Sequence, residues 1–298
     1  MSVKKAHASD SSETPLVAVD ERGTLVLEDR PSENRPVDTT WVEQHSQIAV
    51  QWKKVIARYS GIHYVRYGDV VQIGSGTQMR TFIEAIQDRQ RDQDRRLDLL
   101  VLTSNLEVVA KGRQPGKYPM RIILTGGEML ESLYCLAGEY AAKAVSTELF
   151  FPRVVVFGAA GIKFTDLRPL SYHFPDEVST QVAYATRPTQ HRIIMCDHTK
   201  FGFHDGLKAD LTLGALLDNT ETCTVVTSMP DDDDASVARL EREEEALRQS
   251  LRRMATDDRY KGKDFVLEFV SRNAERVRGI SLKEEYERLA QVAADKQP

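Results

Sequence analysis

Residues 68–77 read GDVVQIGSGT, and the fold class of the chain is inferred from this stretch and its surroundings. Residues 70–73 form a short run of β-branched and apolar residues, which predicts a strand. Residues 74–77 alternate glycine with hydroxyl residues, and apolar residues at helical spacing follow over 79–86. A glycine-rich turn between a strand and a helix offers free backbone N–H groups and the helix N-terminus to an anion. Residues 74–77 therefore predict a phosphate-cradling loop, although such a turn also occurs for purely structural reasons.

Two known phosphate motifs are excluded for this loop. No Gly-Lys-Ser/Thr follows the turn, so it is not the loop that binds nucleoside triphosphates. Met79 stands where the dinucleotide-binding fingerprint needs its third glycine. The expected ligand group is therefore a phosphate or another anion.

Outward from this loop, five further β-rich runs mark the chain. They span residues 97–103, 121–124, 153–157, 192–196 and 223–227. Helical patterns lie around them, including an apolar stripe at 48–59 before the first strand and an apolar stretch at 133–149. Strands that alternate with helical crossovers form a parallel sheet with helices on both faces. We expect a Rossmann-like, mostly parallel α/β fold whose ligands bind at the carboxyl ends of the strands.

The two ends of the chain differ from this pattern. Residues 1–40 are polar, with two short apolar runs that predict a flexible or hairpin-like N-terminal arm. After residue 227 we expect three helical stretches, at 237–254, at 265–277 and after Ser281, which stands three residues before Glu284 as in a capping box. The predicted domains are the arm (1–40), the α/β domain (41–247) and a helical C-terminal extension (248–298).

Composition limits the class of protein. The 298 residues are 41% hydrophobic with a formal charge of −5, so no general affinity for nucleic acid is implied. The apolar runs are far shorter than a membrane-spanning helix needs, and the polar start is unlike a signal peptide, which predicts a cytoplasmic protein. Cys135, Cys196 and Cys223 are too widely spaced for a zinc site or a disulfide framework, and we interpret them as buried thiols. We expect no metal and no cofactor.

Small and polar residues follow each predicted strand. Asn105 fits a helix cap as well as a ligand contact, and the glycines fit tight turns as well as close approach to a ligand. An acid and an amine after the fifth strand could bind a sugar and its phosphate, or form a surface ion pair. The candidate ligand-binding residues are Gly74, Ser75, Gly76, Thr77, Ser104, Asn105, Gly126, Gly127, Gly158, Asp197 and Lys200.

Taken in order, these segments resemble the ligand-sensing C-terminal domain of DeoR-type repressors, a relative of ribose-5-phosphate isomerase and similar folds. The resemblance runs from about residue 47 to about residue 247. It rests on residues 68–77, 102–105, 124–128, 158–162, 197–202 and 224–228. It implies that Ser75, Gly76 and Thr77 hold the phosphate of a sugar-phosphate effector. It also implies that Asn105, Gly127, Asp197 and Lys200 surround the sugar, and that the protein forms a homo-oligomer.

Two departures from the family are visible. The family's repressors carry an N-terminal winged helix-turn-helix, whereas residues 1–40 are polar and hairpin-like, so DNA binding by this chain alone is not expected. The acidic-Val-Lys motif of the family aligns with Thr180, Gln181 and Val182, which leaves the identity of the effector open.

Three functions compete. The first is a non-enzymatic sensor in transcription regulation that binds a phosphorylated sugar or nucleotide-like molecule and signals through oligomer contacts or a protein partner at the C-terminal helices. The second is a sugar-phosphate isomerase-like or nucleoside-acting enzyme, with Glu128 or Asp197 as base and Lys200 as electrophile. The third is a DNA-binding regulator that uses basic residues of the tail, although the interleaved acids favour a solvated helical surface. Those basic residues are Arg252, Arg253, Arg259, Lys261, Lys263, Arg272, Arg276 and Arg278.

Overall fold

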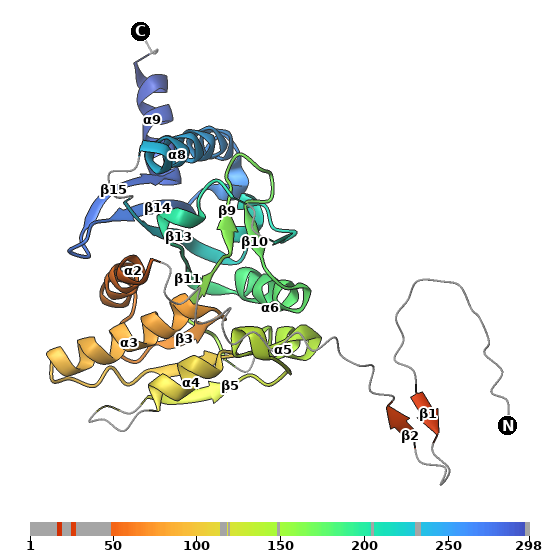
Figure 1. Ribbon diagram of the computed structural model, residues 1–298. Coiled ribbons are helices and arrows are strands. Elements are labelled where there is room, and N and C mark those ends of the chain that lie inside the picture. The colour runs from red at the N-terminus through yellow and green to blue at the C-terminus, as the bar shows by residue number, and fades with distance from the viewer. Residues whose placement is uncertain are drawn as a thin grey trace, which may run out of the picture. The chain divides into compact units, whose positions relative to one another are not determined.

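The computed structural model divides the chain into two units, Met1–Thr39 and Thr40–Pro298 (Figure 1). It describes residues 17–19, 25–27, 49–113, 118, 120–147, 150–203, 206–229 and 234–295. In the first unit, β1 (Val17–Val19) pairs antiparallel with β2 (Leu25–Leu27), which confirms the two strands of the predicted hairpin. The rest of the predicted arm lies outside the described residues.

An eight-stranded sheet organises the second unit, in the order β15-β14-β13-β11-β8-β3-β4-β5. Every neighbouring pair is parallel except β14 and β15. The strands are β3 (Val70–Ile73), β4 (Leu100–Thr103), β5 (Arg121–Leu124), β8 (Val154–Gly158), β11 (Thr189–Met195), β13 (Thr220–Ser228), β14 (Asp264–Val270) and β15 (Arg276–Ser281). All six predicted strands are in this sheet, so the Rossmann-like, mostly parallel fold is confirmed.

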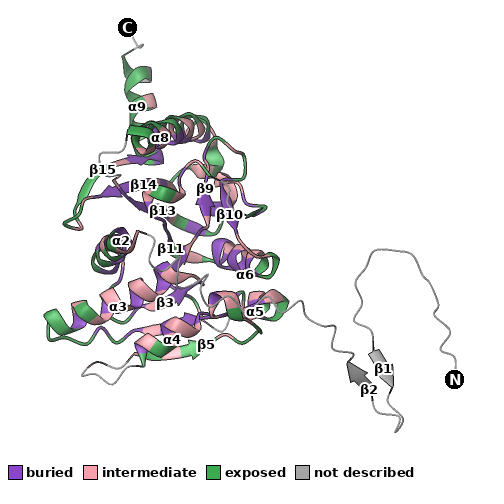
Figure 2. Cartoon of the chain, viewed as in Figure 1, coloured by how far each residue is buried: buried purple, intermediate pink, exposed green. Residues whose placement is uncertain are grey.

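Helices cover both faces of the sheet, and alternate strand residues point into two separate cores. In β8, Val154 and Val156 face the core under α2 (Val50–His63) and α3 (Thr77–Asp92), while Val155 and Phe157 face the other core. All four side chains are fully buried, and Figure 2 shows buried strands between helices with exposed outer surfaces. The remaining helices are α4 (Leu106–Gly112), α5 (Gly138–Val145), α6 (Pro175–Thr186), α7 (Leu213–Leu217), α8 (Asp234–Met254) and α9 (Leu282–Ala294).

Short elements fill the connections. A small sheet in the order β12-β10-β9 joins β9 (Gly161–Ile162), β10 (Leu170–Tyr172) and β12 (Leu207–Lys208). A hairpin pairs β6 (Glu128–Leu130) with β7 (Cys135–Ala137), so the predicted helix at 133–149 is shortened to α5. The 3₁₀ turns are η1 (Glu131–Leu133), η2 (His198–Lys200) and η3 (Asp258–Tyr260).

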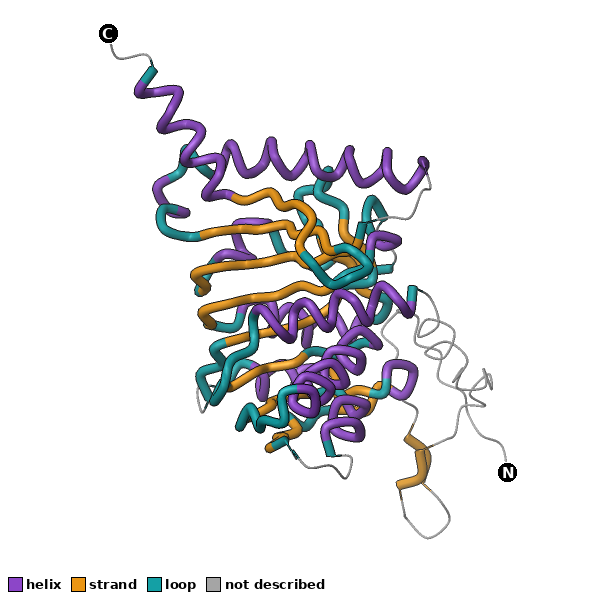
Figure 3. The backbone as a smooth tube through the Cα atoms, turned by 90° about the vertical axis from the view of Figure 1, so that its left-hand side faces the viewer, coloured by secondary structure: helices purple, strands orange, loops and turns teal. Residues whose placement is uncertain are grey.

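The C-terminal region combines helices with strands. The predicted helix at 265–277 is wrong, because Phe265, Leu267 and Phe269 alternate into the core as β14 pairs with β13. The helices on either side are confirmed as α8 and α9, which lie at the β15 end of the sheet (Figures 1 and 3). The capping box is also confirmed: Glu284 N–H donates to Ser281 Oγ (3.1 Å), and Ser281 N–H donates to Glu284 Oε2 (3.3 Å).

The three cysteines are free and buried, as interpreted from their spacing. Burial raises the pKa of Cys135 and Cys223 to about 12 and raises that of Cys196 further. Their thiolate forms are therefore disfavoured near neutral pH. No helix in the described part of the chain is both long and apolar enough to cross a membrane.

Candidate functional site

The candidate site lies where the strand order of the sheet reverses. β3 is the first strand of the sheet in the chain, yet it lies between β4 and β8 in the middle. The connections of β3 and β8 therefore leave in opposite directions, which opens a crevice at their carboxyl ends in folds of this class. Loop 74–77 follows β3 and Gly158 ends β8, so the fold brings these predicted site residues to the same edge.

Two glycines shape loop 74–77, and each is required for a different reason. Gly74 N–H donates to the Val156 carbonyl (2.8 Å), and a Cβ on Gly74 would lie 2.8 Å from the Cβ of Phe157. Gly76 has a φ of +100°, and a Cβ there would have open space around it. Gly76 precedes α3, and no side chain caps the N-terminus of this helix. Backbone N–H groups at the start of α3 are therefore available to donate hydrogen bonds to an anion.

Ser75 faces the protein interior. Its side chain is 3% exposed, accepts a hydrogen bond from Gln181 Nε2 (2.6 Å) and donates to Glu177 Oε1 (3.3 Å). The hydroxyl therefore anchors the loop to α6. A ligand contact from Ser75 would come from its backbone N–H.

Lys53 of α2 reaches this loop, and sequence reasoning missed it. The residue is 4% exposed, and its Nζ donates to Thr77 Oγ1 (3.3 Å). Burial, followed by the charge of Lys200, lowers the pKa of Lys53 to about 8, while Asp197 acts in the opposite direction. The available signal was a lysine inside the apolar stripe of a predicted helix, a position where an ordinary exposed lysine does not occur.

Ser104 and Asn105 support the loop from β4. Asn105 Oδ1 caps α4 by accepting from the N–H groups of Glu107 (2.9 Å) and Val108 (3.2 Å), and its Nδ2 donates to the Gly76 carbonyl (3.2 Å). Ser104 is fully buried and exchanges hydrogen bonds with the Tyr184 hydroxyl. Asn105 is thus a helix cap, as the sequence allowed, and also ties α4 to the candidate anion loop.

Asp197 and Lys200 follow β11 and lie near Lys53, whose pKa both of them influence. Asp197 is 1% exposed, and its Oδ1 accepts hydrogen bonds from the backbone and the hydroxyl of Thr199. Lys200 Nζ donates to the Ala159 carbonyl just after β8 (2.9 Å). The structure therefore brings the two predicted residues together with the lysine of α2.

His198 contacts a different set of residues. Its Nδ1 lies 2.8 Å from Ser228 Oγ, and its ring packs edge-on against Trp52 at 5.7 Å. These contacts place His198 over the ends of β11 and β13, where it supports α2.

The predicted residues Gly126 and Gly127 lie in the connection between β5 and β6, and Glu128 begins the β6–β7 hairpin. A Cβ on Gly127 would lie 2.7 Å from the Cβ of Ala141, so this glycine is needed for packing against α5. Glu128 is exposed, and no hydrogen bond or ion pair among the described residues joins its side chain to loop 74–77.

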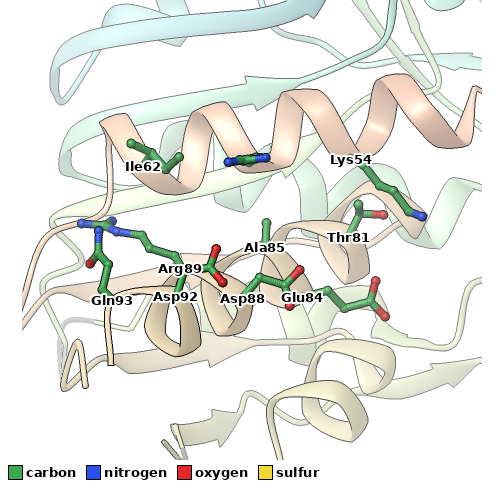
Figure 4. A pocket seen from close by; sticks show the side chains of 10 residues that line it. Lys54, Ile62, Thr81, Glu84, Ala85, Asp88, Arg89, Asp92 and Gln93 are labelled. Atoms are coloured by element: carbon green, nitrogen blue, oxygen red, sulfur yellow. The ribbon is translucent and has the colours of Figure 1, made fainter. Parts of the chain in front are cut away.

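A separate groove of about 490 Å³ opens between α2 and α3 (Figure 4). Lys54 and Arg58 line it from α2, and Glu84, Asp88 and Asp92 line it from α3. Because both signs of charge line this groove, it offers no net positive charge to a phosphate. None of the predicted site residues lines it.

Comparison with known proteins gives a family for most of this region. Residues 48–211 match the family described as the DeoR C terminal sensor domain. A search of curated proteins finds no match.

Similar solved structures include ribose 5-phosphate isomerase from Plasmodium falciparum, with 15% identity over 50% of this chain and 51% of that chain, at a TM-score of 0.35. Ribose 5 phosphate isomerase A from Neisseria gonorrhoeae has 14% identity over 50% and 52%, at a TM-score of 0.31. eIF2B delta from Chaetomium thermophilum has 14% identity over 55% and 53%, at a TM-score of 0.34. The chain spans about half the length of these structures.

The matched segment covers more than half of the 298 residues, and it includes loop 74–77, Asn105, Asp197 and Lys200. The chain therefore belongs to the family of DeoR C-terminal sensor domains.

Proposed function

We propose that this chain is a non-enzymatic sensor that binds a phosphorylated sugar or a nucleotide-like molecule, with the phosphate at loop 74–77. One observation carries the proposal: the ammonium group of the buried Lys53 lies at the uncapped N-terminus of α3. The positive end of a helix and a buried ammonium repel each other, and Lys200 adds to the repulsion. A bound anion would be attracted by all three positive groups, the helix N-terminus, Lys53 and Lys200, and would offset their mutual repulsion.

The surrounding loops support a ligand larger than phosphate. Open space lies around Gly76 and Gly126, so neither backbone is covered by a side chain at these positions. We propose that Asp197 and Lys200 contact the sugar or base portion beside the phosphate. Hydroxyl groups suit this pair, since a carboxylate accepts and an ammonium donates.

The proposed output runs through α8, which lies beyond the matched segment. A Cβ on Gly202, just after η2, would lie 2.6 Å from the Arg239 side chain, and the Arg239 guanidinium lies 4.5 Å from the centre of the Phe203 ring. Glu243 accepts hydrogen bonds from the backbone and hydroxyl of Thr165 (3.1 and 3.3 Å). A ligand that repositions η2 would therefore act on α8, and through it on an oligomer or a protein partner.

A ligand screen tests the proposed function. We expect ribose 5-phosphate, other sugar phosphates or nucleoside monophosphates to raise the thermal unfolding midpoint, and the unphosphorylated compounds to leave it unchanged. Proton NMR spectra of the same mixtures, which distinguish isomers of equal mass, should show no conversion. Stabilisation by no phosphorylated compound would contradict the binding role, and product formation would contradict the non-enzymatic one.

A further inference from the structure

A buried carboxyl group lies directly behind the candidate anion loop. Glu177, in the first turn of α6, is 6% exposed, and its Oε1 accepts hydrogen bonds from Ser75 Oγ (3.3 Å) and Gln181 Nε2 (3.5 Å). Its Oε2 is buried without a hydrogen-bond partner among the described residues. A carboxylate oxygen in this position loses its hydration without full replacement, which favours the protonated form.

Groups from each neighbouring element face Glu177. The charge of Glu177 acts on Tyr172 of β10 and on Cys135 of β7. Burial raises the pKa of the Tyr172 phenol and of the Cys135 thiol, so both groups are neutral near pH 7. Lys200 of η2 and the backbone N–H of His173 favour the ionised carboxylate. Burial outweighs them, and it raises the pKa of Glu177 above its ordinary value.

Ser75 connects this carboxyl group to the anion loop. Its hydroxyl is bonded to Glu177, and its backbone belongs to the cradle before α3. An anion in the cradle and an ionised Glu177 would therefore lie on opposite sides of one residue. Two negative charges so close repel strongly in a partly dehydrated site, whereas a neutral carboxyl group does not.

We propose that Glu177 takes up a proton from solvent when an anion binds at loop 74–77, so that the site senses the anion and acidity together. This inference rests on the proposed function, because it requires an anion in that loop. In this binding reaction the protein takes up one anion at loop 74–77 and one proton from solvent at Glu177. The consequence is tighter anion binding as the pH falls through the range in which the free protein ionises Glu177.

Any test must distinguish proton uptake by Glu177 from proton uptake by Lys53. With a pKa of about 8, Lys53 also binds more protons when an anion is present, but only near and above that pH. Near pH 6 Lys53 is already protonated in the free protein. The charge of phosphate also changes in this range, so inorganic sulfate, whose charge is constant, is the better probe.

The experiment is calorimetric titration of the full chain with sulfate near pH 6, in two buffers of different ionisation enthalpy. We expect net proton uptake by the wild-type protein and its loss in Glu177→Gln. Asp176→Asn, an exposed neighbour on the same turn of α6, should behave as wild type. In a pH series below pH 7, the sulfate affinity of the wild type should fall by up to about tenfold per pH unit as the pH rises through the titration of Glu177, whereas that of Glu177→Gln stays constant.

Two results would overturn the inference alone: sulfate binding without proton uptake, or uptake that persists in Glu177→Gln. Failure of both sulfate and phosphate to bind at any pH would overturn the proposed function together with it. If Glu177→Gln does not fold, infrared difference spectra of the wild type decide. Sulfate must then increase the absorption of a protonated carboxyl group, and no increase refutes the proposal.

Discussion

Gly74 lies where loop 74–77 passes against β8. Because Gly74 has no side chain, the ends of β3 and β8 can approach each other closely. A Cβ there would lie 2.8 Å from the Cβ of Phe157 and 3.1 Å from Gln181 Oε1. The same close approach lets Gln181 reach Ser75. The anchoring of the candidate anion loop therefore depends on the missing side chain of Gly74 as well as on the hydrogen bond between Gln181 and Ser75.

We expect Gly74→Ala to lower the free energy of unfolding by about 1–3 kcal/mol, because the buried strand end must move to admit the methyl group. Gly61→Ala is the matched control, since its Cβ would make an ordinary 3.5 Å contact with Ile86 inside α2. That variant should be neutral or stabilised by up to about 1 kcal/mol. Urea denaturation measures both changes, and equal stability of the two variants would refute the steric argument.

At the scale of helices and strands, the local sequence pattern was sufficient to predict much of the fold. Each of the six predicted strands shows a β-rich run beside turn residues, and each is in the large sheet. The alternation of Phe265, Leu267 and Phe269 was also present, but pairing with β13 made it a strand, and that contact is distant in sequence.

The candidate site was predicted only in part, for a similar reason. The strand-end residues follow from the pattern of strands, which is local. Lys53 comes from a helix and Glu177 from the acidic first turn of another, where acids are common for reasons of the helix dipole. Their role depends on which elements pack together, and only the folded structure shows it.

One strand residue makes stability depend on pH. His191 of β11 lies against Tyr64 and near Thr224 Oγ1 (3.0 Å), and burial, followed by the charges of Arg153 and Arg66, lowers its pKa to about 4. The unfolded chain binds a proton here below its ordinary pKa of 6.5, whereas the folded protein does not. The stability contributed by neutral His191 is therefore lost as the pH falls from about 6.5 to about 4.

We expect His191→Gln to remove this dependence. Between pH 7 and pH 4, the free energy of unfolding of the wild type should fall by about 3 kcal/mol more than that of the variant. Denaturation curves at several pH values measure the difference, which cancels contributions from other titrating groups. Parallel pH profiles for the two proteins would contradict this account of His191.

The contact between η2 and α8 is the element through which the proposed signal passes. Saturating ribose 5-phosphate should slow amide hydrogen exchange in loop 74–77 and in α8. Arg239→Ala should keep the first effect and lose the second, while Arg242→Ala, an exposed neighbour, should keep both. Protection of the loop without any change in wild-type α8 would contradict this route.

At the scale of the whole molecule, the chain adds α7, β13, α8, η3, β14, β15 and α9 beyond the segment that matches its family. The basic residues of this region are largely balanced by acids. Ion pairs join Arg252 to Glu285, Arg259 to Asp257, Arg276 to Glu268 and Arg278 to Glu244. This balance favours the solvated helical and strand surface over a surface for nucleic-acid phosphates.

A comparison of two adjacent lysines tests whether an anion binds at loop 74–77. Lys53 lies at loop 74–77, whereas Lys54 lines the groove between α2 and α3 (Figure 4). By calorimetry near pH 7 with ribose 5-phosphate, or with the tightest phosphorylated compound of the screen, Lys53→Met should weaken binding by roughly 10- to 100-fold, the loss of a charge-assisted hydrogen bond. Lys54→Met should bind as tightly as the wild type. Equal affinity of the two variants would contradict an anion site at loop 74–77.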